Sequence, residues 1–137
     1  APIVDVGQGS PADYDGKEVR GAVVLGDAGV GRLWQAAVVQ RGAVGVVSTA
    51  LESYIRPGPP GSPADRAPRD EWDVLQWGGV PIDEARRGFG FKASPRAAAR
   101  IRARLANGPA TIRADITSSF SPGSPSLPGS VTSSPEP

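Results

Sequence analysis

The segment from Gly16 to Ser48 constrains the fold of this 137-residue chain more than any other part of it. It contains a short apolar run, Ala22–Leu25, bounded by glycines, as expected for a strand that is covered on both faces. A Gly-rich turn follows, and apolar residues then recur at helical spacing, namely Val30, Leu33, Trp34, Ala37 and Val38. Gly42 stands where this helix should end, and Ala43–Val47 supplies a second apolar run. The order predicts a strand-helix-strand unit with two parallel strands.

The turn between the first strand and the helix, Gly26–Leu33, has the glycine spacing of a phosphate-binding P-loop. Two positions do not fit that motif, because Arg32 replaces the lysine that reaches the phosphates and Leu33 replaces the hydroxyl that holds Mg²⁺. Asp27 would also place a negative charge near the helix N-terminus, where a phosphate binds. We therefore expect Gly31 to serve a tight turn, and we infer no nucleotide site and no cofactor.

A second helix is predicted at Pro95–Ala106, because Ser94 suits the N-cap and Pro95 suits the first turn. The pair Asn107-Gly108 marks its end, since a glycine there allows the positive φ that follows many helices. The residues Ala98, Ile101 and Leu105 form the narrow apolar stripe by which this helix would pack on a sheet.

The second helix also carries four arginines, Arg96, Arg100, Arg102 and Arg104, which could form a partner surface or a solvated face. Nucleic-acid binding usually requires a broader basic surface with aromatic platforms. The net charge of the chain is only +1, and this helix has no aromatic residue. The sequence therefore favours a solvated face and argues against a nucleic-acid partner.

Two parts of the chain resemble the protease-associated (PA) domain family. The first is GKEVRGAVVL at residues 16–25 with RGAVGVV at residues 41–47, and the second is GFGFKASPR at residues 88–96 with the sequence that follows it to Ala114. The sequence of the second part, together with WGGVP at residues 77–81, is most similar to the insert domain of bacterial secreted zinc aminopeptidases. The resemblance covers about residues 3–117. It implies an α/β (α+β) domain whose mixed sheet or open barrel is flanked by two principal helices, at about Arg32–Arg41 and Pro95–Ala106.

The absence of histidine and cysteine limits the chemistry open to this chain. It excludes Ser-His-Asp and Cys-His nucleophile systems, zinc sites built on His or Cys, and disulfides. A zinc aminopeptidase needs histidine ligands, so the chain cannot contain that catalytic domain. The closest acidic groups are Asp13 with Asp15, Asp70 with Glu71 and Asp73, and Asp83 with Glu84. All lie in apparent turns, where acidic residues usually serve caps and solubility, so we expect no metal site and no catalysis.

The long stretch Glu52–Pro81 is too rich in proline to form a helix or an interior strand. It holds the candidate contact residues Tyr54, Arg56, Trp72 and Trp77. One interpretation is a rim that touches a neighbouring domain, a peptide or a glycan. The alternative, which the sequence slightly favours for the two tryptophans, is that they fold back as a small satellite core.

The final residues, 118–137, are mostly Ser, Pro and Gly and predict a disordered tail or linker after a domain at residues 1–117. No signal segment and no apolar span of membrane length occurs, so no membrane insertion is expected. The resemblance implies an extracellular or periplasmic protein.

The leading functional hypothesis is a non-catalytic accessory domain. It would contact the peptidase catalytic domain or its peptide substrate and thereby shape substrate access. The alternative is a free-standing peptide- or ligand-binding module that uses the 52–81 loop. A small enzyme with a degenerate nucleotide-binding loop is a third and more distant hypothesis.

Overall fold

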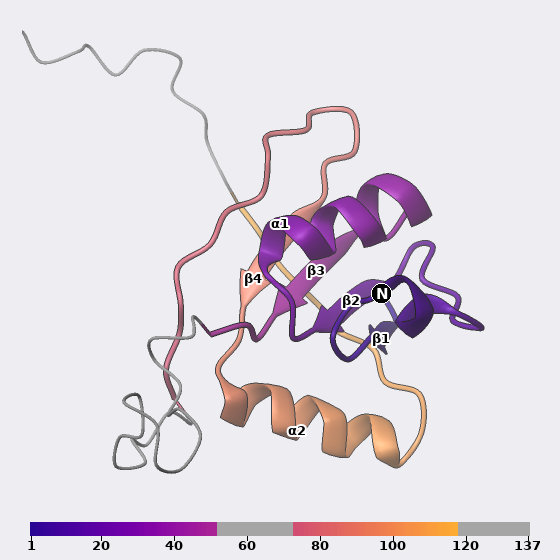
Figure 1. Ribbon diagram of the computed structural model, residues 1–137, viewed down its shortest axis with the longest axis vertical. Coiled ribbons are helices and arrows are strands. Elements are labelled where there is room, and N and C mark those ends of the chain that lie inside the picture. Colours follow the sequence, from indigo (N-terminus) through magenta and orange to yellow (C-terminus); the bar gives the residue numbers. More distant parts are fainter. Residues whose placement is uncertain (52–72, 118–137) are drawn as a thin grey trace, which may run out of the picture.

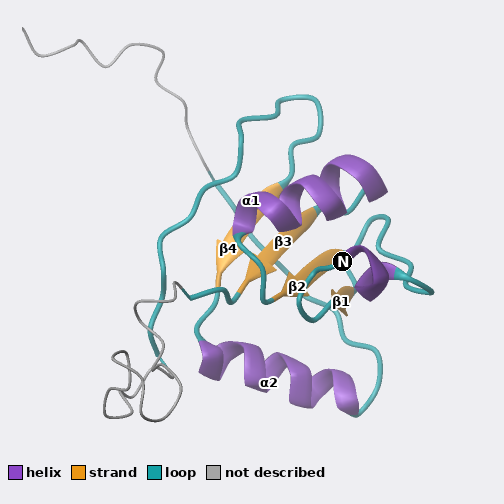
Figure 2. Cartoon of the chain, in the orientation of Figure 1, coloured by secondary structure: helices purple, strands orange, loops and turns teal. Residues whose placement is uncertain are grey.

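The computed structural model describes residues 1–51 and 73–117, which form an α/β fold around a four-stranded sheet (Figure 1). The strands are β1 (Ile3–Asp5), β2 (Val23–Gly26), β3 (Gly45–Ser48) and β4 (Phe89–Lys92), in the spatial order β1-β2-β3-β4. The helices are η1 (Pro11–Tyr14, a 3-10 helix), α1 (Val30–Leu33), η2 (Trp34–Val39, a π-helix that continues α1) and α2 (Pro95–Ala106). Figure 2 shows α1 and α2 on opposite faces of the sheet. No helix in the described ranges is long and apolar enough to cross a membrane.

Both faces of the sheet are buried, and side chains alternate between them along each strand. One face contributes Val4, Val24 and Val46, which stand in register and pack with Leu33, Trp34, Ala37 and Val38 of the α1–η2 helix. The other face contributes Ile3, Val23, Leu25 and Val47, which pack with Ala98, Ile101 and Leu105 of α2. The apolar stripes predicted for the two helices are therefore confirmed, and each stripe covers one face of the sheet.

All four strands are parallel, whereas the resemblance implied a mixed sheet or an open barrel. The antiparallel contribution within the described residues is an isolated bridge between Pro2 and Thr111. Around it, the Ile3 N–H donates to the Ala110 carbonyl at 3.0 Å, and the Ile112 N–H donates to the Ala1 carbonyl at 2.8 Å. The chain after α2 thus returns to cover the outer edge of β1. It does so as a single bridge and not as a closing strand.

The helices largely follow the predicted boundaries. The first begins at Val30, two residues before the expected Arg32, with Gly29 at its N-cap, and it continues through η2 to Arg41. The bounds of α2 are those predicted, and the Ser94 hydroxyl accepts a hydrogen bond from the Ala97 N–H at 3.2 Å. The π-helical geometry of η2 has no signature in the sequence.

Two of the three glycines expected to be structural have the backbone that requires glycine. Gly42 has φ +76° and Gly108 has φ +130°, each just after the end of a helix. The prediction for Gly31 is wrong, because this residue lies inside α1 without a positive φ, and a Cβ there would meet open space. The turn ends earlier than expected, at Gly29, so Gly31 already belongs to the helix. The predicted tail at residues 118–137 lies outside the described residues.

Gly42→Val is expected to lower the free energy of unfolding by about 1–3 kcal/mol, because a β-branched residue is strained at φ +76°. Urea denaturation followed by circular dichroism measures this change. Gly31→Ala is the matched control. It adds a Cβ in open space within a helix, so it should leave stability unchanged or raise it by about 0.5–1 kcal/mol. Equal effects of the two substitutions would contradict the C-cap assignment of Gly42.

Candidate functional site

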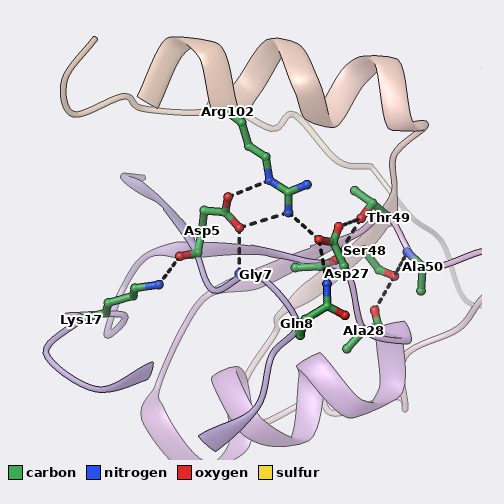
Figure 3. Close-up of polar contacts among 11 residues, drawn as sticks. Asp5, Gly7, Gln8, Lys17, Asp27, Ala28, Ser48, Thr49, Ala50 and Arg102 are labelled. Carbon is green, nitrogen blue, oxygen red and sulfur yellow. Dashed lines mark hydrogen bonds and ion pairs between the residues drawn. The ribbon is translucent and has the colours of Figure 1, made fainter. Parts of the chain in front are cut away.

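Polar side chains gather at the carboxyl edge of the sheet, where open parallel sheets usually hold their ligands (Figure 3). Asp5 ends β1, Asp27 follows β2, Ser48 ends β3 and Lys92 ends β4. Arg102 reaches the same edge from α2. The parallel register sets the strand ends side by side, so residues far apart in the sequence form one cluster.

Arg102 joins the ends of β1 and β2 through a forked ion pair. Its Nε donates to Asp5 Oδ2 at 2.7 Å, and its Nη2 donates to Asp5 Oδ1 at 3.2 Å and to Asp27 Oδ2 at 3.0 Å. Asp5 lies on the face that α2 covers, because it is two residues beyond Ile3 on the same strand. The guanidinium therefore fastens α2 to the sheet at the edge where α2 would otherwise have only apolar contacts.

The electrostatics of this cluster keep both partners of the Asp5–Arg102 pair charged. Burial alone would raise the pKa of Asp5. The hydrogen bonds from Arg102 and from the Gly7 N–H, with the charges of Arg102 and Lys17, outweigh burial and hold this pKa below 3.8. The hydrogen bond to Asp5 is the largest cause that raises the pKa of Arg102, and the contact with Asp27 adds to it. Lys17 Nζ also donates to the Asp5 carbonyl at 2.6 Å.

A second part of the cluster ties β3 and β4 to the turn after β2. The Ser48 hydroxyl donates to the Ala28 carbonyl at 2.7 Å, and Lys92 Nζ donates to Ser48 Oγ at 3.1 Å and to the Ala50 carbonyl at 2.5 Å. Thr49 Oγ1 donates to the Asp27 carboxylate. Ser48 is fully buried and Thr49 is 6% exposed, so these contacts hold the backbone of three strand ends together.

The arrangement is suited to structural work and poorly suited to catalysis. A serine next to a lysine can act as a nucleophile, but the Ser48 side chain is fully buried and its proton is already donated to a carbonyl. The carboxylates of Asp5 and Asp27 are both bound by Arg102, so neither is placed to act as a general base. The described part of the chain holds no group of three or more acidic, His or Cys residues that could bind a metal ion.

Exposed large apolar side chains also occur around β4, the edge strand opposite β1. They belong to the segment before β4, to β4 and to the segment after α2, and they are Leu75, Trp77, Ile82, Phe91 and Ile116. We call this set the β4-side surface. Two of its residues, Ile82 and Ile116, line a cavity of about 720 Å³ together with Val80 and Phe89. The rings of Phe89 and Phe91 lie 5.5 Å apart, which links the cavity to the exposed face of β4.

The contact residues predicted from sequence are only partly described. Tyr54, Arg56 and Trp72 lie outside the described residues, so their predicted contact role stays a prediction. Trp77 is described and is 88% exposed, which contradicts the interpretation that it folds back into a satellite core. The preceding residue, Gln76, is buried, so adjacent side chains alternate between the protein interior and solvent, and Trp77 points to solvent.

The predicted role in caps and turns is confirmed for Asp13 and Asp83. Asp13 Oδ2 accepts hydrogen bonds from the N–H and the hydroxyl of Ser10 at the start of η1. Asp83 accepts hydrogen bonds from the N–H and the guanidinium of Arg86 in a turn. Asp70 and Glu71 lie outside the described residues.

The solvated face predicted for the arginines of α2 is wrong for Arg102, whose side chain is 34% exposed and paired with two carboxylates. Asp5 was not among the residues predicted to have a role. Arg96 also has a partner, Asp73, at 2.9 Å, although both side chains remain largely exposed. One signal could have found the cluster: Asp5 and Asp27 each stand at the carboxyl end of an apolar run, and parallel strands bring such ends together.

No known protein family, curated protein or solved structure matches this chain. The structure itself establishes the fold class of the described residues, which is a four-stranded parallel sheet with helices on both faces.

Arg102→Gln is expected to lower the free energy of unfolding at pH 7 by about 1–3 kcal/mol, because it leaves two neighbouring carboxylates without their cation. The loss should be smaller than the 3–5 kcal/mol typical of a fully buried pair, since solvent reaches the guanidinium. The lowered pKa of Asp5 means that the pair stabilises the fold above the unfolded pKa of 3.8 and that this contribution is lost as pH falls below it.

Denaturation curves of the wild type and of Arg102→Gln between pH 7 and pH 2.5 test this expectation. The stability difference between the two proteins should shrink as the carboxylates become protonated. Arg104→Gln on the exposed part of α2 removes the same charge and should have little effect at any pH. A pH-independent loss in Arg102→Gln would show that packing of the side chain, and not the ion pair, is responsible.

Proposed function

We propose that this chain is a non-catalytic interaction domain that docks on the catalytic domain of a secreted metallopeptidase and shapes access of peptide substrates to it. The observation that carries the proposal is the β4-side surface, which exposes five large apolar side chains from three segments. Such surfaces are typical of sites where another protein binds. Trp77 stands out, because tryptophan is among the residues that most often dominate binding energy at interfaces.

The position of this surface at a sheet edge also supports docking. The outer edge of β1 is covered by the chain after α2, whereas β4 pairs with β3 alone among the described strands. An edge strand that has no second partner strand can pair with foreign chains, and proteins usually protect such an edge. A docked catalytic domain would cover β4 and its apolar neighbours together.

The polar cluster at the carboxyl edge supports the non-catalytic part of the proposal. Its carboxylates are bound by Arg102 and its serine is buried, so the chemistry would come from the partner domain. The link to a metallopeptidase comes from the resemblance of residues 16–47 and 77–114 to the insert domains of secreted zinc aminopeptidases. The alternative of a free-standing binding module based on the 52–81 loop falls mostly on residues outside the described ranges.

The proposal predicts that Trp77→Ser combined with Ile82→Ser alters the full-length protein that contains this chain. We expect the KM for peptides to change, or the preference for peptide length to shift, by about fivefold or more, since removal of one interface anchor costs 1–2 kcal/mol or more. Steady-state kinetics on a series of peptides of two to eight residues measures both quantities.

The control is Arg100→Ser, an exposed substitution on α2 away from the β4-side surface. Its kinetics should equal those of the wild type. The fluorescence of Trp77, obtained as the difference between the wild type and Trp77→Phe, should shift to shorter wavelength in the full-length protein relative to the isolated chain. Unchanged kinetics together with a Trp77 that stays solvated in the full-length protein would overturn the proposal.

A further inference from the structure

A cavity separate from the β4-side surface lies between η1 and the α1–η2 helix. Its volume is about 380 Å³, within the usual range for small-molecule pockets. Gly9, Pro11 and Tyr14 line one side, and Arg32, Gln35, Ala36, Gln40 and Arg41 line the other. η1 directly follows β1, which is the edge strand opposite β4, so the cavity lies on the β1 side of the sheet.

The Tyr14 hydroxyl is the feature that needs an explanation. The side chain is 5% exposed, and its hydroxyl oxygen is buried with no hydrogen-bond partner among the described residues. A buried hydroxyl without a partner costs about 1–3 kcal/mol, so native proteins nearly always satisfy such a group with protein, water or a ligand. The ring itself is well held, because it packs in the core and the Arg41 guanidinium carbon lies 4.3 Å above its centre.

Two arginines give the cavity a positive charge. Arg41 is largely committed, since its Nη1 donates to the Ala36 carbonyl at 2.8 Å and to Gln40 Oε1 at 3.1 Å. Arg32 forms no ion pair or hydrogen bond with the rest of the described chain. Burial raises the pKa of Tyr14, and the charges of Arg41 and Arg32 oppose that shift, so both guanidiniums lie within electrostatic range of the hydroxyl.

None of the described residues that line the cavity is acidic. The charge of the Asp13 carboxylate acts on Tyr14, and Asp13 Oδ2 already accepts two hydrogen bonds from Ser10. The wall that carries Arg32, Gln35 and Gln40 belongs to the helix whose middle is π-helical, a geometry that occurs often at functional sites. The cavity therefore combines Tyr14, an uncommitted guanidinium and amide groups, and none of its described lining residues carries a negative charge.

We infer that this cavity is a binding site for a carboxylate on a small apolar body, held by the Tyr14 hydroxyl and the Arg32 guanidinium. One uncommitted guanidinium matches one carboxylate, whose two oxygens can accept from the arginine fork and from the tyrosine. Pro11 and Ala36 supply apolar wall for the attached group. The carboxylate can belong to a peptide C-terminus or to an acidic side chain. This inference does not rest on the proposed docking function, because it concerns a different part of the fold.

Titration of the 137-residue chain with small carboxylates at constant ionic strength tests the site. N-acetyl-Ala-Ala probes the peptide C-terminus, N-acetyl-Asp-amide probes the acidic side chain, and N-acetyl-Ala-Ala-amide is the uncharged control. Chemical-shift changes of backbone amides in η1 and η2 and of the Gln35 side-chain amide report binding. We expect saturable shifts with at least one of the two carboxylates and none with the amide, and the tighter carboxylate identifies the source.

Two variants assign the binding to the named groups. Tyr14→Phe removes only the hydroxyl, and Arg32→Gln removes the guanidinium. Each should raise the Kd about tenfold, the effect of losing one hydrogen bond to a charged group. Arg104→Gln removes an arginine of α2, which does not line the cavity, and should leave the Kd unchanged.

A second measurement separates this site from a cavity filled by water. Without ligand, Tyr14→Phe should keep the melting temperature of the wild type or raise it, because it removes a buried polar group that lacks a partner. The same concentration of carboxylate should raise the melting temperature of the wild type more than that of Tyr14→Phe, because the variant binds it more weakly. The inference is overturned if no carboxylate binds, if inorganic phosphate binds and carboxylates do not, or if Tyr14→Phe destabilises the ligand-free protein and leaves the Kd unchanged.

Discussion

The fold depends on covering both faces of a parallel sheet of very short strands. Each strand has only three or four residues, so the ladder hydrogen bonds alone hold little structure. The α1–η2 helix covers one face with five buried side chains, whereas only Ala98 of α2 is fully buried on the other. The second helix therefore needs a further tie to the sheet. Arg102 provides it by binding Asp5 and Asp27 at the ends of two strands.

This tie determines what the carboxyl edge can do. In open parallel sheets a ligand usually binds at this edge, where backbone and side-chain groups of several strands converge. Here a guanidinium of the same chain takes the place of a cationic ligand between the two carboxylates. Ser48 and Lys92 close the other half of the edge through contacts with backbone carbonyls. The cluster thus stabilises the fold, and both proposed binding surfaces lie on the flanks of the sheet.

The sequence predicted those features of the fold that depend on contacts between residues close together in the chain. The caps of α2, the positive φ of Gly42 and the apolar stripes of both helices follow from residues within one or two turns of each other. The Arg102 pairs were not predictable in this way, because they join residues 97 and 75 positions apart. The parallel pairing of β1 and the π-helical middle of the first helix likewise depend on tertiary packing. The cavity at Tyr14 arises only when η1 packs against η2, so no motif marks it.

Arg102 and Arg32 show how the surroundings of an arginine side chain determine its role. Arg102 has two carboxylates within 3.0 Å, so its charge is neutralised inside the protein and its fork is occupied. Arg32 lines a cavity that has no acidic side chain among its described lining residues, and Tyr14 on the opposite wall has a buried hydroxyl without a partner in the described chain. A charge that is matched internally contributes to stability, whereas a charge beside an unsatisfied donor has binding capacity left for an external anion. Because the matched cluster already occupies the carboxyl edge, an anion would find its donors at the η1–η2 flank, where the carboxylate of Asp13 is itself capped by Ser10.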